Sequence, residues 1–250
     1  MYIDFHNHLD FYTNETIDKA INIINNEEIK TIACSMDEKS YIKNLEISNK
    51  SKYIIPIFGI HPWKVDKGIY NLEKLEKYIK TTPLIGEVGL DFHWVEDKST
   101  YENQIRVFKY FLDCAKKYKK YINVHTKGAE KLVLDLIKKY DISNQTIIHW
   151  YSGDKDTLLK LIDLKCYFTA SVDLYSNTKT IEIIKEIPVN KLLAETDGPI
   201  ALEWVNGVYG MPNEIKKVYR HICKVKCVDL EEFQFSCKEN LMKIINSIYK

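Results

Sequence analysis

The strongest constraint on the fold is an alternation of short apolar runs with longer segments whose apolar residues recur at helical spacing. Strands are expected at residues 1–5, 30–34, 53–58, 84–88, 121–124, 146–149, 166–170 and 191–194. Helices are expected at residues 15–26, 38–50, 72–80, 100–120, 128–139, 155–163 and 178–186, followed by two more at 212–226 and 230–248. Such an alternation is typical of α/β folds with a parallel sheet.

The length of the chain favours one closed barrel built from these units. A chain of 250 residues is typical of a TIM-type (β/α)8 barrel, and no linker-like segment interrupts the series. We therefore predict an α/β fold in which residues 1–250 form a single TIM-type barrel domain with an extra C-terminal helix. The doubly wound open sheet has the same local pattern and is the alternative, although no Gly-x-Gly-x-x-Gly motif follows the first expected strand.

Composition excludes several classes of protein. The 36 Lys and Arg residues balance the 35 Asp and Glu residues, so any contact with nucleic acid has to be local. Apolar stretches such as residues 53–60 are far shorter than the ~20 residues that cross a bilayer, which argues against a membrane partner. The N-terminus, Met1-Tyr-Ile-Asp-Phe-His-Asn-His, lacks the pattern of a secretory signal, and the six cysteines form no Cys-x-x-Cys pair. We expect a cytoplasmic protein with reduced thiols.

Residues of the kinds that bind metal ions stand at the ends of several expected strands. His6 and His8 end the first strand, and the alternation of side chains along a strand places both on one face. The others follow later strands and are Glu87, His125, His149 and Asp197. In a parallel barrel the carboxyl ends of all strands open on one rim, where the active sites of this fold lie. These side chains are therefore expected to meet in one metal site.

The types and the number of these ligands indicate a pair of divalent metal ions. Imidazole and carboxylate groups without thiolates suit Zn²⁺, Mg²⁺ or Mn²⁺ and do not distinguish among them. One ion with four or five protein ligands would leave a histidine unused. Two ions about 3.5–4 Å apart, bridged by a carboxylate, use the whole set and leave places for water. Glu87 is the expected bridge.

Six short motifs span nearly the whole chain. They are Met1-Tyr-Ile-Asp-Phe-His-Asn-His-Leu, Gly59-Ile-His-Pro, Gly86-Glu-Val-Gly-Leu-Asp, Val124-His125, Ile148-His149-Trp-Tyr-Ser-Gly and Glu195-Thr-Asp-Gly-Pro. In these motifs and their order, the chain resembles the TatD family of metal-dependent hydrolases within the amidohydrolase-like barrels. The resemblance implies deoxyribonuclease activity, often exonucleolytic. It also implies one metal held by His6, His8 and Asp197, a second held by His125 and His149, and Glu87 bridging the two.

The chain departs from the family's usual pattern beside these motifs. Thr126-Lys127 stands where the family commonly has Ser-Arg, Trp150-Tyr151 where Cys-Phe is usual, and His93-Trp94 where tyrosine and arginine are frequent. A lysine ammonium is a point charge and does not grip phosphate through two parallel hydrogen bonds as arginine does. The expected metal ligands match the family pattern, whereas the residues expected to contact the substrate differ from it. The resemblance therefore indicates the metal chemistry more clearly than the substrate.

The expected reaction is hydrolysis of phosphodiester bonds in DNA, of the 3′–5′ exonuclease type at single-stranded or frayed ends, by a metal-bridging hydroxide. The candidate catalytic residues are Asp197, Glu87, Glu195 and His61. Asp197 is expected to act as ligand and general base, and Glu195 to accept a ring N–H from a ligand histidine. One alternative is a metal-dependent deacylase or amidase that acts on a carbonyl substrate such as an aminoacyl ester. Another is a metal-dependent binding protein without turnover.

Candidate substrate-binding residues follow the same strand ends. They are His61, Lys127, His93, Trp94, Trp150 and Trp204. Lys127 stands near the start of a helix, where its ammonium and backbone amides can bind phosphate together. All four tryptophans, including Trp63, follow rim segments, and their faces can stack unpaired bases; the alternative is that they only wall off the loops. Residues 198–210 are expected to form a loop over the site.

Overall fold

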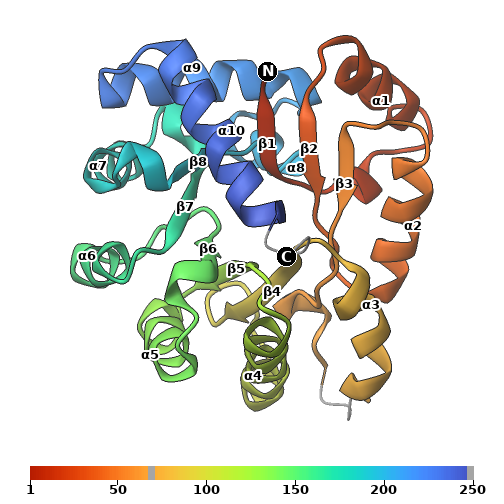
Figure 1. The fold of residues 1–250 in the computed structure, drawn as a ribbon, viewed down its shortest axis with the longest axis vertical. Helices are drawn as coiled ribbons and strands as arrows, with labels where there is room; N and C mark the ends of the chain where they lie inside the picture. Colours follow the sequence, from red (N-terminus) through yellow and green to blue (C-terminus); the bar gives the residue numbers. More distant parts are fainter. Residues whose placement is uncertain (67–70, 247–250) are drawn as a thin grey trace.

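The computed structural model describes residues 1–66 and 71–246 and shows parallel strands surrounded by helices (Figure 1). The strands in this part of the chain are β1 (Ile3–Asn7), β2 (Lys30–Ala33), β3 (Ile54–Pro56), β4 (Ile85–Asp91), β5 (Ile122–Lys127), β6 (Thr146–Ile148), β7 (Tyr167–Ala170) and β8 (Leu192–Ala194). Each strand overlaps one of the expected apolar runs. The prediction of an α/β fold of the TIM-barrel type is confirmed.

Backbone hydrogen bonds close the strands into a ring. Parallel ladders join neighbouring strands in the order β1-β2-β3 in one group and β4-β5-β6-β7-β8 in another. Between β3 and β4, the Gly86 N–H donates to the Phe58 carbonyl at 2.9 Å, and between β8 and β1 the Asp197 N–H donates to the His6 carbonyl at 2.9 Å. Because β8 lies beside β1, the doubly wound open sheet is excluded. The carboxyl ends of all these strands therefore share one rim.

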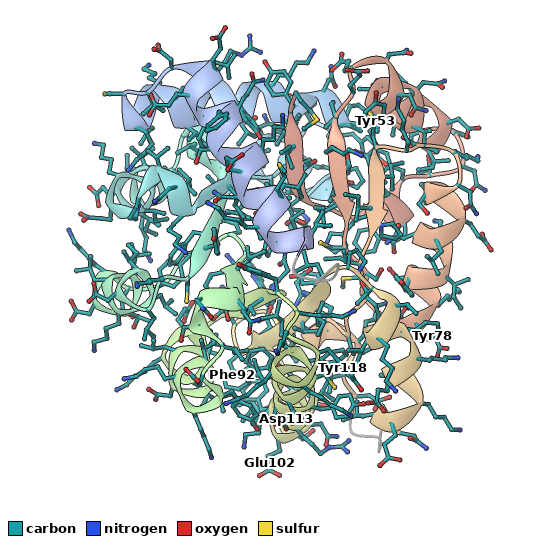
Figure 2. The ribbon with its side chains drawn as sticks, viewed as in Figure 1. Tyr53, Tyr78, Phe92, Glu102, Asp113 and Tyr118 are labelled. Carbon is teal, nitrogen blue, oxygen red and sulfur yellow. The ribbon has the colours of Figure 1, made fainter. Side chains whose placement is uncertain are left out.

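Helices cover the outside of the barrel (Figure 1). Those in the described residues are α1 (Ile17–Asn26), α2 (Glu38–Ser48), α3 (Glu76–Thr81), α4 (Tyr101–Tyr118), α5 (Glu130–Tyr140), α6 (Lys155–Asp163), α7 (Thr178–Glu186), α8 (Ile200–Asn206), α9 (Ile215–Lys226) and α10 (Leu230–Asn246). Charged side chains such as Glu102 and Asp113 lie on the outer face of α4 (Figure 2). Within residues 1–66 and 71–246, every helix is too short or too polar to span a bilayer.

The segment after β8 differs from its prediction. Residues 198–210 were expected to be a loop, but they contain α8. This helix starts after Pro199 and ends at Gly207, which has the left-handed φ of 75° that favours glycine at a helix end. The helix was missed because it is only seven residues long and starts without a side-chain cap. Three helices, rather than two, therefore follow β8 in the described part, and residues 247–248 of the last expected helix lie outside it.

The helices α9 and α10 close the amino-terminal end of the barrel. The buried Tyr219 hydroxyl on α9 accepts from the Ile3 N–H at 3.2 Å and donates to the Ile3 carbonyl at 3.1 Å, at the start of β1. Phe233 of α10 is buried against the Tyr219 ring. Because this end is sealed, the carboxyl-terminal rim is the end at which a site can open.

A glycine allows two of the strands that carry the site to approach closely. Gly89 in β4 has a φ of 151°, and a Cβ atom there would lie 2.0 Å from the His125 carbonyl oxygen of β5. Any side chain at this position would separate the strands, so glycine is required. The close approach brings Glu87 of β4 and His125 of β5 toward one point.

We expect Tyr219→Phe to lower the free energy of unfolding by about 1–3 kcal/mol, because the substitution leaves a buried Ile3 N–H without its partner. Equilibrium unfolding in urea measures the change. The matched control is Tyr53→Phe, which removes an exposed hydrogen bond to Glu28 and should change stability by less than about 0.5 kcal/mol. Equal losses in the two variants would contradict this account of the sealed end.

Candidate metal centre

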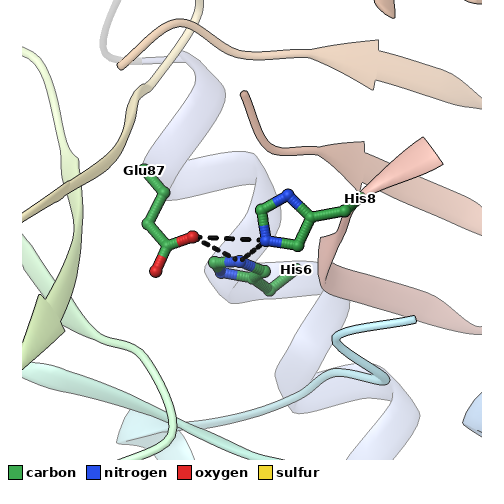
Figure 3. A group of neighbouring side chains, drawn as sticks. All are labelled: His6, His8 and Glu87. Atoms are coloured by element: carbon green, nitrogen blue, oxygen red, sulfur yellow. Dashed lines mark hydrogen bonds and ion pairs between the residues drawn. The ribbon is translucent and has the colours of Figure 1, made fainter. Parts of the chain in front are cut away.

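The expected metal-type side chains converge at the carboxyl-terminal rim, with Glu87 facing His6 and His8 (Figure 3). The Nε2 atoms of His6 and His8 are 3.2 Å apart and lie 3.1 and 3.3 Å from Glu87 Oε2. Asp197 Oδ1 lies 3.7 and 3.5 Å from the same two nitrogens. Atoms that share one ion through bonds of about 2.0–2.2 Å are about 3–3.5 Å apart. This group has the spacing of a single cation site.

The other oxygen of Glu87 faces a second group of ligands. Glu87 Oε1 lies 3.0 Å from His125 Nδ1 and 3.9 Å from His149 Nε2. Asp197 Oδ2 lies 3.7 Å from the same His149 nitrogen. Glu87 therefore presents one oxygen to each pair of histidines, and Asp197 presents one oxygen to His6 and His8 and the other to His149. The arrangement can hold two cations with Glu87 between them.

Hydrogen bonds on the far side of the rings fix the tautomers of two ligand histidines. His149 Nδ1 lies 2.8 and 2.9 Å from the Glu195 carboxylate oxygens, so this nitrogen donates and Nε2 keeps its lone pair. This contact is the one expected for Glu195. His6 Nδ1 lies 3.3 Å from Asn123 Oδ1, which likewise leaves Nε2 as the acceptor atom. Partners of this kind orient metal-binding histidines and raise their basicity.

The surroundings of His125 test whether the site fits a metal ion. Its Nε2 donates to Asp91 Oδ2 at 2.9 Å, so in the neutral ring Nδ1 carries a lone pair. That lone pair lies 3.0 Å from Glu87 Oε1, which is also an acceptor. Contacts with Glu87 and Asp91 raise the pKa of His125 against burial, because a positive charge is favoured between Nδ1 and Glu87, whether a second proton or a metal ion supplies it. The donor set and its orientation therefore fit a bound divalent metal.

His61 is the neighbour of this centre that acts as a donor. The Trp63 N–H donates to His61 Nδ1 at 3.1 Å, so the neutral ring carries its proton on Nε2. That nitrogen lies 3.3 Å from both Glu87 Oε1 and His125 Nδ1. Burial lowers the pKa of His61 to about 4, which keeps the ring neutral. Although His61 is close enough to share an ion with its neighbours, its proton makes it a hydrogen-bond donor instead of a ligand.

Buried carboxylates support the metal-type ligands from behind. Asp4 in β1 accepts from the Thr196 N–H at 2.9 Å and from its hydroxyl at 2.6 Å, which ties β1 to the segment that carries Asp197. Burial raises the pKa of Asp4 to about 7 against these hydrogen bonds. Burial likewise raises the pKa of Glu195 to about 7. Asp91 shows the opposite balance, because hydrogen bonds from His125 and other donors outweigh burial and lower its pKa.

Lys127 lies near the centre with its ammonium partly enclosed. Its Nζ donates to the Trp150 carbonyl at 3.2 Å and to Ser152 Oγ at 2.9 Å, and it lies 5.3 Å from the centroid of the Trp150 ring. Burial lowers the pKa of this ammonium. The negative charges of Asp173 and Asp197 act in the opposite direction. The ammonium is therefore oriented by two neutral acceptors and lies near acidic groups of the centre.

The aromatic residues of the rim separate into different environments. Trp94 is exposed beside the exposed ring of His93, with ring centroids 4.6 Å apart, whereas Trp150 is half-buried against the core. Trp204 of α8 is exposed and lies next to Trp63. Each of the predicted substrate-binding aromatic side chains thus follows the carboxyl end of a strand, but only some expose a ring face.

Two contacts of the centre were not expected from the sequence. Asn123 holds His6, and its position two residues before His125 in β5 was a usable signal, because such residues share one face of a strand. Phe11 stacks on His8 with centroids 4.9 Å apart and an interplanar angle of 18°. It lies in a short 3-10 turn without helical or strand periodicity, so no periodic pattern identifies it.

The sequence and the fold of this chain are similar to those of known metal-dependent hydrolases. The model of the family described as TatD related DNase matches residues 3–246. An uncharacterised metal-dependent hydrolase of Methanocaldococcus jannaschii is 27% identical over 97% of this chain and 96% of its own length. An uncharacterised metal-dependent hydrolase of Bacillus subtilis, YabD, is 26% identical over 98% of both chains. The crystal structure of YjjV, a TatD homologue of Escherichia coli, superposes with a TM-score of 0.88 at 21% identity, covering 98% of each chain.

We expect Glu195→Gln to weaken the binding of one metal ion by about 10- to 100-fold, because the amide no longer holds His149 with a negative charge. Titration calorimetry with Mn²⁺ on chelator-treated protein measures the affinity. Glu182→Gln, on the exposed face of α7, is the control and should bind as the unchanged protein does. Unaltered affinity in Glu195→Gln would show that this carboxylate has no part in metal binding.

Proposed function

Because this chain belongs to the TatD related DNase family, we propose that its metal-dependent hydrolase activity is that of a deoxyribonuclease acting on single-stranded or frayed ends of DNA. The observation that carries the proposal is the pair of oxygens of Glu87, one facing each pair of histidines. A pair of metal ions suits phosphodiester hydrolysis because it can stabilise both the attacking and the leaving oxygen. The relatives in Methanocaldococcus jannaschii and Bacillus subtilis are described as metal-dependent hydrolases, with no substrate given.

We propose that the centre binds two divalent ions. The ligands of one would be His6, His8, Asp197 and one oxygen of Glu87, and those of the other His125, His149 and the second oxygen of Glu87. When bound, the ions would lower the pKa of water and neutralise charge on the phosphate group.

Asp197 is the candidate general base. Its side chain is about 10% exposed, whereas those of Glu87 and Glu195 are almost completely enclosed, so Asp197 is the carboxylate that water can reach. Burial raises the pKa of Asp197 against the attraction of the histidines around it. This shift favours acceptance of a proton at a carboxylate oxygen during the reaction.

His61 and Lys127 would hold the phosphate group. His61 presents its Nε2–H to the centre, where it can donate to a phosphate oxygen. An ammonium has three donors, and Lys127 uses two of them on Trp150 and Ser152. The third donor and the positive charge remain for the substrate. Together these residues would fix the phosphate beside Glu87 while solvent is excluded by the buried rings.

We expect metal-dependent cleavage of an end-labelled single-stranded oligonucleotide, and a loss of about 10²–10⁴-fold in kcat/KM for Asp197→Asn because the base is removed. Gel analysis with Mn²⁺, and with a chelator in its place, measures the activity. Asp163→Asn, at an exposed position of α6, is the control and should retain full activity. Hydrolysis of aminoacyl esters or lactones but not of oligonucleotides would contradict the proposal in favour of a deacylase. Tight binding of DNA without turnover would favour a binding protein.

We expect Lys127→Met to raise KM for an oligonucleotide by about tenfold or more, because a charged hydrogen bond to phosphate is lost. The slope of log KM against log salt concentration should also fall by about 0.7, the value for one phosphate contact on a single strand. Lys127→Arg restores the charge and should recover most of the affinity. Lys160→Met, on the exposed face of α6, should leave both quantities as they were. A salt slope unaltered by Lys127→Met would rule out the phosphate contact.

A further inference from the structure

Trp63 presents one indole face beside the candidate metal centre. It lies in the 3-10 turn Pro62–Lys64 that follows β3, and it is 40% exposed. Its ring centroid lies 5.0 Å from that of His61 and 6.3 Å from that of His125. The indole is held in place because Nε1 donates to Asp91 Oδ2 at 2.7 Å, and the same oxygen accepts from His125.

Trp204 adds a second ring from a distant part of the chain. It lies on α8, after β8, and is 62% exposed. The centroids of Trp63 and Trp204 are 6.3 Å apart, and their planes make an angle of 54°. The two rings therefore expose adjoining aromatic surfaces at the rim, beside the histidines that surround Glu87. Two large exposed indoles side by side mark a binding surface more than scattered exposure does.

We propose that Trp63 and Trp204 form a stacking site for the base of one unpaired nucleotide whose phosphate lies at the metal centre. This inference rests on the proposed deoxyribonuclease function and names the part of the substrate that the site recognises. The base would stack on one indole, with the other closing against its edge or opposite face. Trp204 acts as a binding residue, and Trp63 acts both as a binding residue and as a neighbour of the centre through Asp91.

The chemistry of the rings favours a base as the occupant. The hydrogen-bond donor of Trp63 is already used by Asp91, so that indole offers only its face. A face without a free donor binds flat rings without reading their edges, as proteins do that bind single strands of any sequence. The near balance of 36 basic and 35 acidic residues leaves little net charge to attract DNA, so stacking would add affinity that is independent of charge.

A base-paired end does not fit this site as well as an unpaired one. Stacking on an indole face requires that the base leave its neighbours in the duplex, which costs energy for each paired base. Frayed or single-stranded ends avoid that cost. The stacking site would therefore give the preference for unpaired DNA that the metal centre, which contacts only phosphate, does not supply.

The first experiment compares steady-state kcat/KM for an oligothymidylate and for the same oligonucleotide with abasic residues at both ends. We expect Trp204→Leu to lower kcat/KM for the first substrate by about 10- to 100-fold and to change that for the abasic substrate little. Trp63→Leu also removes the hydrogen bond to Asp91, so it should lower kcat/KM for both substrates, and more for the first. Trp63→Phe keeps an aromatic face and should recover part of the loss. Phe235→Leu, at an exposed position of α10, is the control and should not distinguish the substrates. Equal losses on both substrates would overturn the inference.

The second experiment measures binding and does not depend on turnover. Fluorescence anisotropy of metal-loaded protein with a labelled phosphorothioate oligothymidylate should give tighter binding than with the abasic form, and Trp204→Leu should abolish the difference. Thermal melts check that the variants are folded. Base-dependent binding without hydrolysis would sustain the stacking site while the proposed function fails. Hydrolysis of DNA with no base dependence in either experiment would sustain the function and refute the stacking site.

Discussion

The site depends on one carboxylate placed between two pairs of histidines. Glu87 is almost completely buried, and each of its oxygens faces ring nitrogens at distances near 3 Å. The bonds that hold this arrangement lie farther out, from His6 to Asn123, from His149 to Glu195 and from His125 to Asp91. In the neutral rings those hydrogen bonds turn lone pairs toward Glu87, so the fold has assembled ligands around a point that favours a positive charge.

The barrel brings the residues of this arrangement together from distant parts of the chain. Closure between β8 and β1 brings Asp197 beside His6 through a backbone hydrogen bond, although the two are far apart in the sequence. Gly89 lets β4 approach β5 so that Glu87 and His125 meet. The helices α9 and α10 seal the opposite end through Tyr219. The rim is consequently the place where buried polar groups and solvent come together.

Much of the candidate metal centre could be predicted from the sequence, because the carboxyl ends of parallel strands lie together in a barrel. His149 follows β6, and His6 and His125 lie in the carboxyl-terminal halves of β1 and β5, which the parallel barrel places at one rim. The roles of Asn123 and Phe11 depend on ring orientation, which no spacing rule gives. The pairing of Trp63 with Trp204 depends on α8, a short helix without a cap that was predicted as a loop. The sequence therefore predicts which strands carry the site, whereas the orientation of rings and the contacts between distant side chains could not be predicted from it.

The most direct test of the account is an anomalous-scattering map of crystals grown with Mn²⁺ or Zn²⁺. The account predicts two peaks that flank the carboxylate of Glu87, one bound by His6 and His8 and the other by His125 and His149. A single ion, or ions bound away from Glu87, would contradict it.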